Sequence, residues 1–129
     1  MVAPVKVTPV TADPNISVIV SIANGTALSP AIPLGFGACL VGIVAPAAWT
    51  AAVLTFQASF DGVTYFNLFG DTAEYSIPSA IIVTGNTIYV DRTKFDAVRF
   101  IKLRSGTTAT PVNQGAQRDF KFVTLPSKS

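Results

Sequence analysis

The sequence predicts an all-β protein built as a sandwich or barrel. Short runs rich in β-branched and aromatic residues recur along the chain, and almost no segment has helical periodicity. Pairs typical of tight turns separate these runs, namely Asn24-Gly25, Asp61-Gly62 and Gly85-Asn86. Counting the runs gives about eight strands, a number typical of small β-sandwiches and barrels. A chain of 129 residues fits one domain with a sizeable core.

We divide the chain into an extended N-terminal arm (1–14), a β-sandwich domain (15–125) and a C-terminal tail (126–129). The arm contains three prolines and no apolar periodicity, so it is either disordered or lies across a neighbouring subunit. It lacks a charged segment followed by a long apolar one, and we therefore expect neither a signal peptide nor a membrane anchor. Glycines and a proline interrupt the longest apolar stretch, 35–52, which argues against a membrane span.

The first predicted strand is 15–22, which is rich in valine and isoleucine. The turn at Asn24-Gly25 then predicts a hairpin with 27–34 as the partner strand. Pro30 and Pro33 cannot donate ladder hydrogen bonds, so this partner is expected to be an edge or irregular strand.

Glycines at 35 and 37 predict a corner before 38–45, an almost continuous apolar run typical of a strand in the middle of a sheet or at an interface. The run contains Cys39, the single cysteine, which we interpret as a small buried hydrophobe. Residues 46–50 form a loop with the single tryptophan, Trp49. We expect its ring to cap the core; the alternative is an exposed platform on which a ligand stacks.

The central feature is a hairpin over 53–68. Leu54, Phe56 and Ala58 alternate with Thr55, Gln57 and Ser59, which predicts one buried face and one face in water. The turn at Asp61-Gly62 reverses the chain, because glycine tolerates positive φ and aspartate bonds local backbone.

The remaining elements are shorter. We predict strands at 74–77, 80–84, 87–90, 98–105 and 117–125, and one helical turn at 91–95 with Asp91 as its N-cap. In 98–105, Ile101 and Leu103 are expected inside and Lys102 and Arg104 in water. The last strand places Phe120 and Phe122 on one face, and a loop rich in threonine and glycine spans 106–116.

The composition indicates a surface that is partly covered by a partner. Half of the residues are hydrophobic and only 12% are charged, which is a thin charged coat for a free monomer. The net charge is +2 and the basic residues are scattered. We therefore expect no nucleic-acid partner and no membrane partner.

Catalysis is not expected, and neither a cofactor nor a metal is predicted. The chain has no histidine, which removes most nucleophilic triads and the commonest transition-metal ligand. Asp61, Asp71 and Glu74 lie close in sequence; we interpret them as solvated turn residues, and the alternatives are a glycosidase acid pair or a calcium site. Gly35 and Gly37 lack the helix and third glycine of a dinucleotide-binding loop.

The polar run 104–107 has two interpretations. The simpler one is a solvated strand end followed by a turn. In the other, Arg104 bridges to a carboxylate of a neighbouring subunit while Ser105 and Thr107 bond loop backbone.

Two stretches resemble galactose-binding-like and discoidin-like jelly rolls. Ser59, Asp61 and Gly62 match a Ser-x-Asp-Gly turn between two strands of that fold, and 98–105 (VRFIKLRS) matches a later strand. The resemblance covers about a quarter of the chain and implies a jelly-roll sandwich. It carries over no ligand residue.

A broader resemblance, over 32–123, is to small structural proteins of tailed bacteriophages. It rests on Trp49-Thr50-Ala51-Ala52, Phe56-Gln57-Ala58-Ser59, Asp61-Gly62, Arg104-Ser105-Gly106-Thr107, Pro111-Val112 and Gln114. It implies a virion protein, most simply a capsid decoration or cement protein that forms a homo-oligomer, with a trimer favoured, and binds the major capsid protein or another virion protein. The alternative is a tail or head-fibre module that recognises host-surface carbohydrate, with Trp49 or Tyr65 stacking on a sugar ring.

Overall fold

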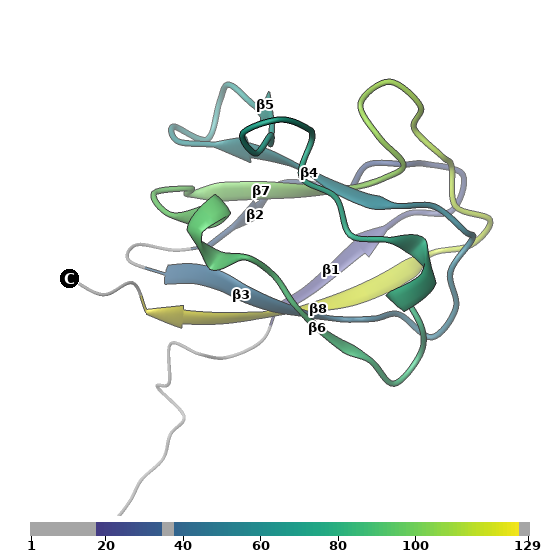
Figure 1. Cartoon of the computed structure of the whole chain (residues 1–129). Helices are drawn as coiled ribbons and strands as arrows, with labels where there is room; N and C mark the ends of the chain where they lie inside the picture. The colour runs from purple at the N-terminus through teal and green to yellow at the C-terminus, as the bar shows by residue number, and fades with distance from the viewer. Residues whose placement is uncertain (1–17, 35–37, 127–129) are drawn as a thin grey trace, which may run out of the picture.

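The computed structural model describes residues 18–34 and 38–126 and is an all-β sandwich, as the sequence predicts. Eight strands form two antiparallel sheets of four strands each, which lie face to face (Figure 1). The strands are β1 (Val18–Ile22), β2 (Ile32–Pro33), β3 (Ala38–Val44), β4 (Leu54–Ser59), β5 (Phe66–Asn67), β6 (Thr87–Tyr89), β7 (Phe100–Ser105) and β8 (Arg118–Pro126). The described residues also include two 3-10 helices, η2 (Ser79–Ile81) and η3 (Arg92–Phe95).

Several predicted segments lie outside the described residues. These are the arm, 1–14; the first three residues of the predicted strand 15–22; the corner at 35–37; and the tail beyond residue 126.

The strand pairing is that of a jelly roll. The pairs β4–β5, β3–β6, β2–β7 and β1–β8 are nested, as in one long hairpin that reverses between β4 and β5. Rolling this hairpin brings β3 against β8 and β4 against β7. The result is one sheet of order β1-β8-β3-β6 and a second of order β2-β7-β4-β5 (Figure 1).

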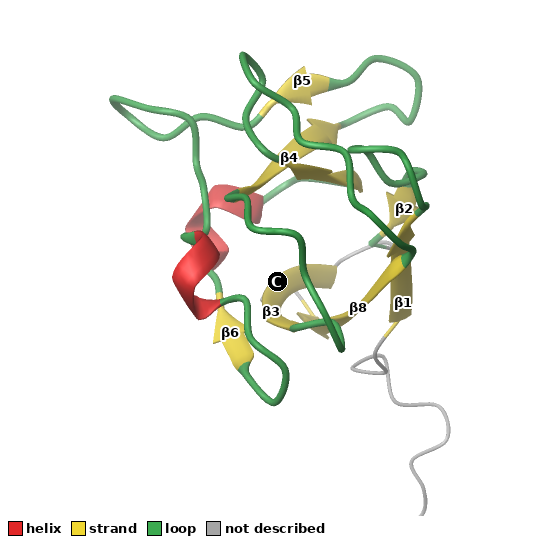
Figure 2. Ribbon diagram, turned by 90° about the vertical axis from the view of Figure 1, so that its right-hand side faces the viewer, coloured by secondary structure: helices red, strands yellow, loops and turns green. Residues whose placement is uncertain are grey.

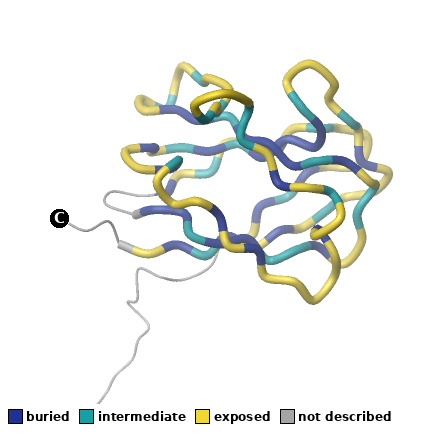
Figure 3. The backbone as a smooth tube through the Cα atoms, viewed as in Figure 1, coloured by how far each residue is buried: buried dark blue, intermediate teal, exposed yellow. Residues whose placement is uncertain are grey.

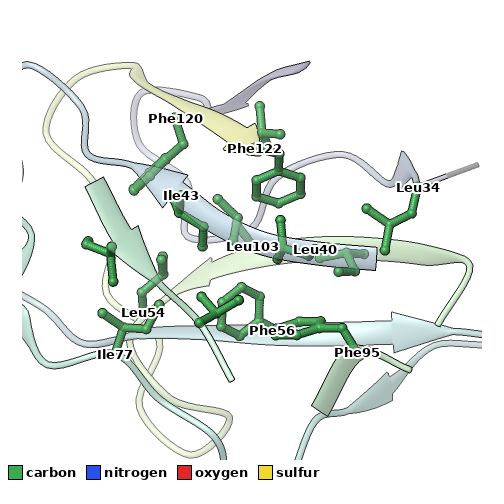
Figure 4. Close-up of a cluster of buried hydrophobic side chains, with 14 of the residues drawn as sticks. Leu34, Leu40, Ile43, Leu54, Phe56, Ile77, Phe95, Leu103, Phe120 and Phe122 are labelled. Atoms are coloured by element: carbon green, nitrogen blue, oxygen red, sulfur yellow. The ribbon is translucent and has the colours of Figure 1, made fainter. Parts of the chain in front are cut away.

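Side chains from the inner faces of both sheets form one core. The largest fully buried side chains include Phe56 of β4, Phe95 of η3, and Phe120 and Phe122 of β8. The ring of Phe56 lies edge-on to that of Phe95, with 5.2 Å between the ring centroids. Buried and more exposed positions alternate along β8 (Figure 3), and the close-up shows residues from both sheets pointing toward one another (Figure 4). The predicted inward positions of Phe56, Phe120 and Phe122 are confirmed.

The prediction of a hairpin between 15–22 and 27–34 is wrong. β1 pairs with β8 and β2 pairs with β7, so the chain crosses from one sheet to the other after the turn at Asn24-Gly25. The turn itself is confirmed, with φ of +78° at Gly25. The turn pairs with the backbone of Gln114 and not with the strand that follows it. The carbonyl of Gln114 accepts a hydrogen bond from the Gly25 amide, and the amide of Gln114 donates one to the Thr26 carbonyl.

In the second half of the chain, two predicted strands are wrong and several other elements are confirmed. The strands predicted at 74–77 and 80–84 are not strands: the first makes only isolated bridges, and the second begins within η2, whose N-cap residue, Pro78, is extended. The turn at Gly85 is confirmed by its φ of +95°. The predicted N-cap is also confirmed, since the Asp91 side chain accepts a hydrogen bond from the Thr93 amide at the start of η3.

One buried amide joins the loops at the far end of the sandwich from the β4–β5 turn. Gln114 Oε1 accepts from Thr50 N (2.9 Å) and Arg118 Nε (2.9 Å), and its Nε2 donates to Thr50 O (3.1 Å) and Ser105 Oγ (2.7 Å). Each polar atom of this amide is therefore satisfied although only 1% of the residue is exposed. The loop 106–116 is tied to the loop before β4 through a side chain that mimics backbone pairing.

Candidate interaction surface

Four large apolar side chains gather around the β4–β5 hairpin, and each is more than half exposed. We call them the hairpin surface; they are Phe60, Val63, Phe66 and Phe69. The register pairs Ala58 with Phe66, so Phe66 lies on the inner face of its sheet, at the margin where the core ends. Within ten positions of sequence, these four side chains leave apolar area exposed at this edge of the sheet, where a protein partner would cover it.

The turn that carries Phe60 and Val63 is held by its own side chains. Asp61 Oδ1 accepts from the amides of Val63 (2.8 Å) and Thr64 (2.9 Å). Ser59 Oγ donates to Asp61 Oδ1 (3.0 Å) and accepts from Gly62 N (2.8 Å). The Thr64 and Val63 amides hold the pKa of Asp61 below its ordinary value. The turn is ordered before any partner binds, which lowers the entropy cost of binding.

Two aromatic contacts anchor the turn to β7. Gly62 has φ of +82°, and a Cβ at this position would lie 2.9 Å from the Phe100 ring, so the ring packs directly against the glycine. The prediction that Gly62 has positive φ is confirmed. Lys102 Nζ lies 4.4 Å from the centroid of the Tyr65 ring, a cation–π contact between β7 and the loop.

Behind the hairpin, Arg104 joins four segments of the outer face of the same sheet. Its Nε donates to Thr55 Oγ1 (3.0 Å), and its Nη2 donates to Glu74 Oε2 (2.7 Å), Thr108 Oγ1 (2.7 Å) and Asn67 Oδ1 (3.2 Å). Only 6% of Arg104 is exposed. The partners come from β4, β5 and two loops, so one guanidinium holds the hairpin and both loops together.

Glu74 completes this arrangement. Its Oε1 accepts from Thr108 N (3.1 Å) and its Oε2 from the Thr108 hydroxyl (2.6 Å). Burial acts to raise the pKa of Glu74, but the hydrogen bonds from Thr108 and the charge of Arg104 outweigh burial, and the pKa is lowered. The carboxylate is therefore ionised at neutral pH and pins the loop 106–111 over the sheet.

These contacts correct two predictions. The face of β4 expected in water is largely covered: Thr55 and Ser59 have no exposed surface, because Arg104 and the Asp61 turn lie over them. Arg104 was expected in water at the end of its strand, and it is buried. Its carboxylate partner belongs to the same chain, not to a neighbouring subunit.

The two aromatic residues considered for sugar stacking lie apart. Trp49 packs against β8 of one sheet, whereas Tyr65 lies beside β7 of the other. The Trp49 ring lies edge-on to Phe120, with 5.2 Å between centroids, and its Nε1 donates to Ala52 O (2.9 Å). Trp49 thus packs on the core, as predicted, and Tyr65 has Lys102 over one face of its ring.

The acidic residues and the cysteine are placed in separate environments. Asp61 bonds its own turn and Asp71 is exposed, but the prediction that Glu74 is a solvated turn residue is wrong, because its side chain is only 12% exposed and pairs with Arg104. Within 18–34 and 38–126, no group of three or more acidic, cysteine or histidine side chains is arranged to hold a metal ion. Cys39 is a free thiol with 1% of the residue exposed, and burial raises its pKa, so the prediction of a small buried hydrophobe is confirmed.

Sequence reasoning did not find the Arg104–Glu74 pair. The two residues are 30 positions apart, and neither lies in a motif that indicates the other. The one signal in the sequence was indirect. Thr55 and Arg104 lie on the outer faces of two predicted strands, and they are identified as neighbours only once the pairing of β4 with β7 is known.

No helix in the described segments is long and apolar enough to cross a membrane. Comparison of the chain with protein-family models, with curated proteins and with solved structures finds no match.

Proposed function

We propose that this chain is a structural component of a bacteriophage particle, a capsid decoration or cement protein that self-associates and binds the capsid lattice through the hairpin surface. The role is architectural and not catalytic. Its partner is the major capsid protein or another virion protein, and the expected homo-oligomer is a trimer.

The observation that carries the proposal is the hairpin surface itself. Phe60, Val63, Phe66 and Phe69 are exposed on a hairpin that is ordered by Asp61 and Ser59 and backed by the buried Arg104. A rigid apolar surface loses little entropy when a partner covers it, and burial of apolar area stabilises by about 25 cal/mol per Å². The low fraction of charged residues, 12%, fits a chain that is covered in its working state.

The jelly-roll topology adds support of a weaker kind, since this fold recurs in viral capsid and lectin domains and by itself names no function. The carbohydrate-binding alternative depends on Trp49 and Tyr65. Trp49 packs on Phe120, and Lys102 covers one face of the Tyr65 ring, so neither ring is a fully open platform for a sugar. These contacts favour the decoration role.

The test uses two matched substitutions. Val63→Lys places a charge in the hairpin surface, and Val83→Lys places the same charge at another exposed valine. We expect both proteins to melt at the wild-type temperature, because both side chains are at least half exposed. Only Val63→Lys should lower retention on purified particles.

Mass spectrometry of purified particles tests the location and copy number. Decoration predicts a copy number comparable with that of the major capsid protein, whereas a few copies at a tail tip support the carbohydrate-binding alternative. Absence of the protein from particles, or equal retention of the two lysine variants, contradicts the proposal.

A further inference from the structure

Among the residues that the structure describes, one sheet edge differs from the other three in having no protection against strand pairing. β1 is the outermost strand of its sheet and has five residues, with no proline and no charged side chain (Figure 2). In the described part of the chain, its backbone has hydrogen-bond partners only in β8. Val18 and Ile19 of this strand are also among the exposed large hydrophobic residues. Unpaired N–H and C=O groups along such an edge bind most favourably to another extended strand.

The other edges are short or covered. β2 has two residues, one of which is Pro33. β5 also has two, and the chain that follows it returns alongside, with Tyr75 N donating to Leu68 O (3.0 Å). β6 has three residues and leads into η3. Short edges and proline are the usual means of preventing strand addition, and β1 has neither.

We propose that β1 is a self-association site, at which β1 of a second copy pairs antiparallel about a twofold axis and joins the two four-stranded sheets into one of eight strands. A strand edge offers a row of alternating donors and acceptors, which only another strand edge matches fully. A second copy fits because β1 is uncharged, so self-pairing brings no like charges directly opposite each other within the strands.

Two conditions set the register of this pairing: the number of residues that are paired, and the requirement that inner-face residues meet inner-face residues. A twofold axis perpendicular to the sheet places inner residues opposite inner residues, so the sum of the paired residue numbers is even. Centring the axis on Val20 pairs all five residues: Val18 meets Ile22, and Ile19 meets Ser21 of the other copy. If the axis is centred instead on Ile19 or Ser21, fewer of the five residues are paired.

Charge on the neighbouring strand favours the same register. On β8, Lys121 is paired with Ile19 and Asp119 with Ser21. The Val20-centred register therefore aligns Lys121 of one copy in a row with Asp119 of the other, across four strands, at a separation of roughly 14 Å between Cα atoms. The register centred on Ile19 aligns lysine with lysine, and the one centred on Ser21 aligns aspartate with aspartate. Screening makes this a small preference, strongest at low salt.

A ladder of five residues is a small interface, so the isolated protein should associate weakly and in a concentration-dependent way. On an assembled particle, contacts repeated by symmetry raise the effective concentration of neighbouring strands. The twofold contact is additional to the threefold contacts of a trimer, and the inference does not depend on where the protein is located.

The experiment measures the mass of the full-length chain in solution across a concentration series that reaches on the order of 1 mM, a range in which weak pairing is detected. The proposal expects even-numbered species, a dimer or, together with a trimer contact, a hexamer. Ile19→Lys, at a residue that is 56% exposed, should halve the mass of that species. Tyr89→Lys, at a residue 85% exposed on β6 at the opposite edge of the same sheet, should leave the mass unchanged.

A cross-link tests the register. In the double variant Ile19→Cys/Ser21→Cys, the two cysteines of one copy lie opposite those of the other, and oxidation should give a covalent dimer. Ile19→Cys alone should not, because its cysteines are offset, and the native Cys39 is buried.

Three results overturn the proposal. One is a monomer at every concentration or a trimer only; a second is an assembly that Ile19→Lys leaves intact. The third is a dimer that forms only after residues 1–14 are deleted, which would mean that the arm covers β1 in the intact chain. Retention on particles is measured separately, so failure here and failure of the decoration role are distinguished.

Discussion

Removing the Arg104 guanidinium should destabilise the protein chiefly by leaving the Glu74 carboxylate without its counter-charge. The two side chains are 7% and 12% exposed, and 2.7 Å separates Arg104 Nη2 from Glu74 Oε2. Arg104→Met keeps much of the side-chain volume but removes the charge and four hydrogen bonds. Glu74 then keeps only the hydroxyl and amide of Thr108 as partners.

The magnitude follows from burial. Breaking a buried ion pair by removing one partner costs about 3 to 5 kcal/mol, and since Glu74 retains slight access to water we expect about 3 kcal/mol. Replacing both partners leaves no isolated charge. The double variant Arg104→Met/Glu74→Leu should therefore be more stable than Arg104→Met alone, and within about 1 to 2 kcal/mol of wild type.

Urea denaturation followed by tryptophan fluorescence measures these free energies, since Trp49 packs on the core. The control is Lys94→Met, which removes an ion pair with Asp91 at the surface, where the two side chains are 31% and 48% exposed. This variant should have the same urea midpoint as the wild type within experimental error. A double variant that is less stable than Arg104→Met would refute the reasoning. So would an Arg104→Met variant no less stable than Lys94→Met.

Three further predictions concern the core, the turn and acid stability. Phe56→Ala should cost roughly 3 to 5 kcal/mol in a thermal or urea melt, because the ring is fully buried; an unchanged melt contradicts the strand register. Gly62→Val should lower stability by roughly 2 kcal/mol or more through positive φ and contact with Phe100. Gly85→Val has the same kind of φ but nothing within 4 Å, so it should cost less, and equal costs would exclude the ring contact. The lowered pKa of Glu74 means that its stabilisation is present above its unfolded value near 4.5 and is lost as pH falls through the lower folded value. Glu74→Gln should flatten that part of the stability–pH curve, and an identical acid limb in both proteins would contradict the assignment.

The arm remains a prediction from sequence. Its valines, at positions 2, 5, 7 and 10, offer apolar contacts that an isolated domain would leave in water. Deletion of 1–14 should leave the melting temperature nearly constant and lower retention on particles. A large drop in melting temperature, or undiminished retention, would contradict an assembly role.

Local signals predicted the elements whose structure depends on neighbouring residues. The Asp61-Gly62 turn forms because the Asp61 carboxylate bonds the amides that follow it, and glycine accepts φ of +82°. The cap at Asp91 uses an amide two residues away. The alternation around Phe56 and Phe120 correctly identified inward faces, since the period of two is a property of the strand itself.

The sequence by itself determined that the chain alternates short apolar strands with tight turns, and hence an all-β sandwich with Phe56, Phe120 and Phe122 inside. Only the tertiary structure decided which strands are partners and what covers each outer face. β1 has the turn signal of a hairpin but pairs with β8, because strand pairing depends on apolar faces that meet across some hundred residues. Arg104 occupies a position that the alternation predicts to be solvent-exposed, but it is buried, because folding into two sheets brings Glu74 and its loop over it. Periodicity and turn chemistry act over a few residues, whereas pairing and burial depend on contacts that no local pattern encodes.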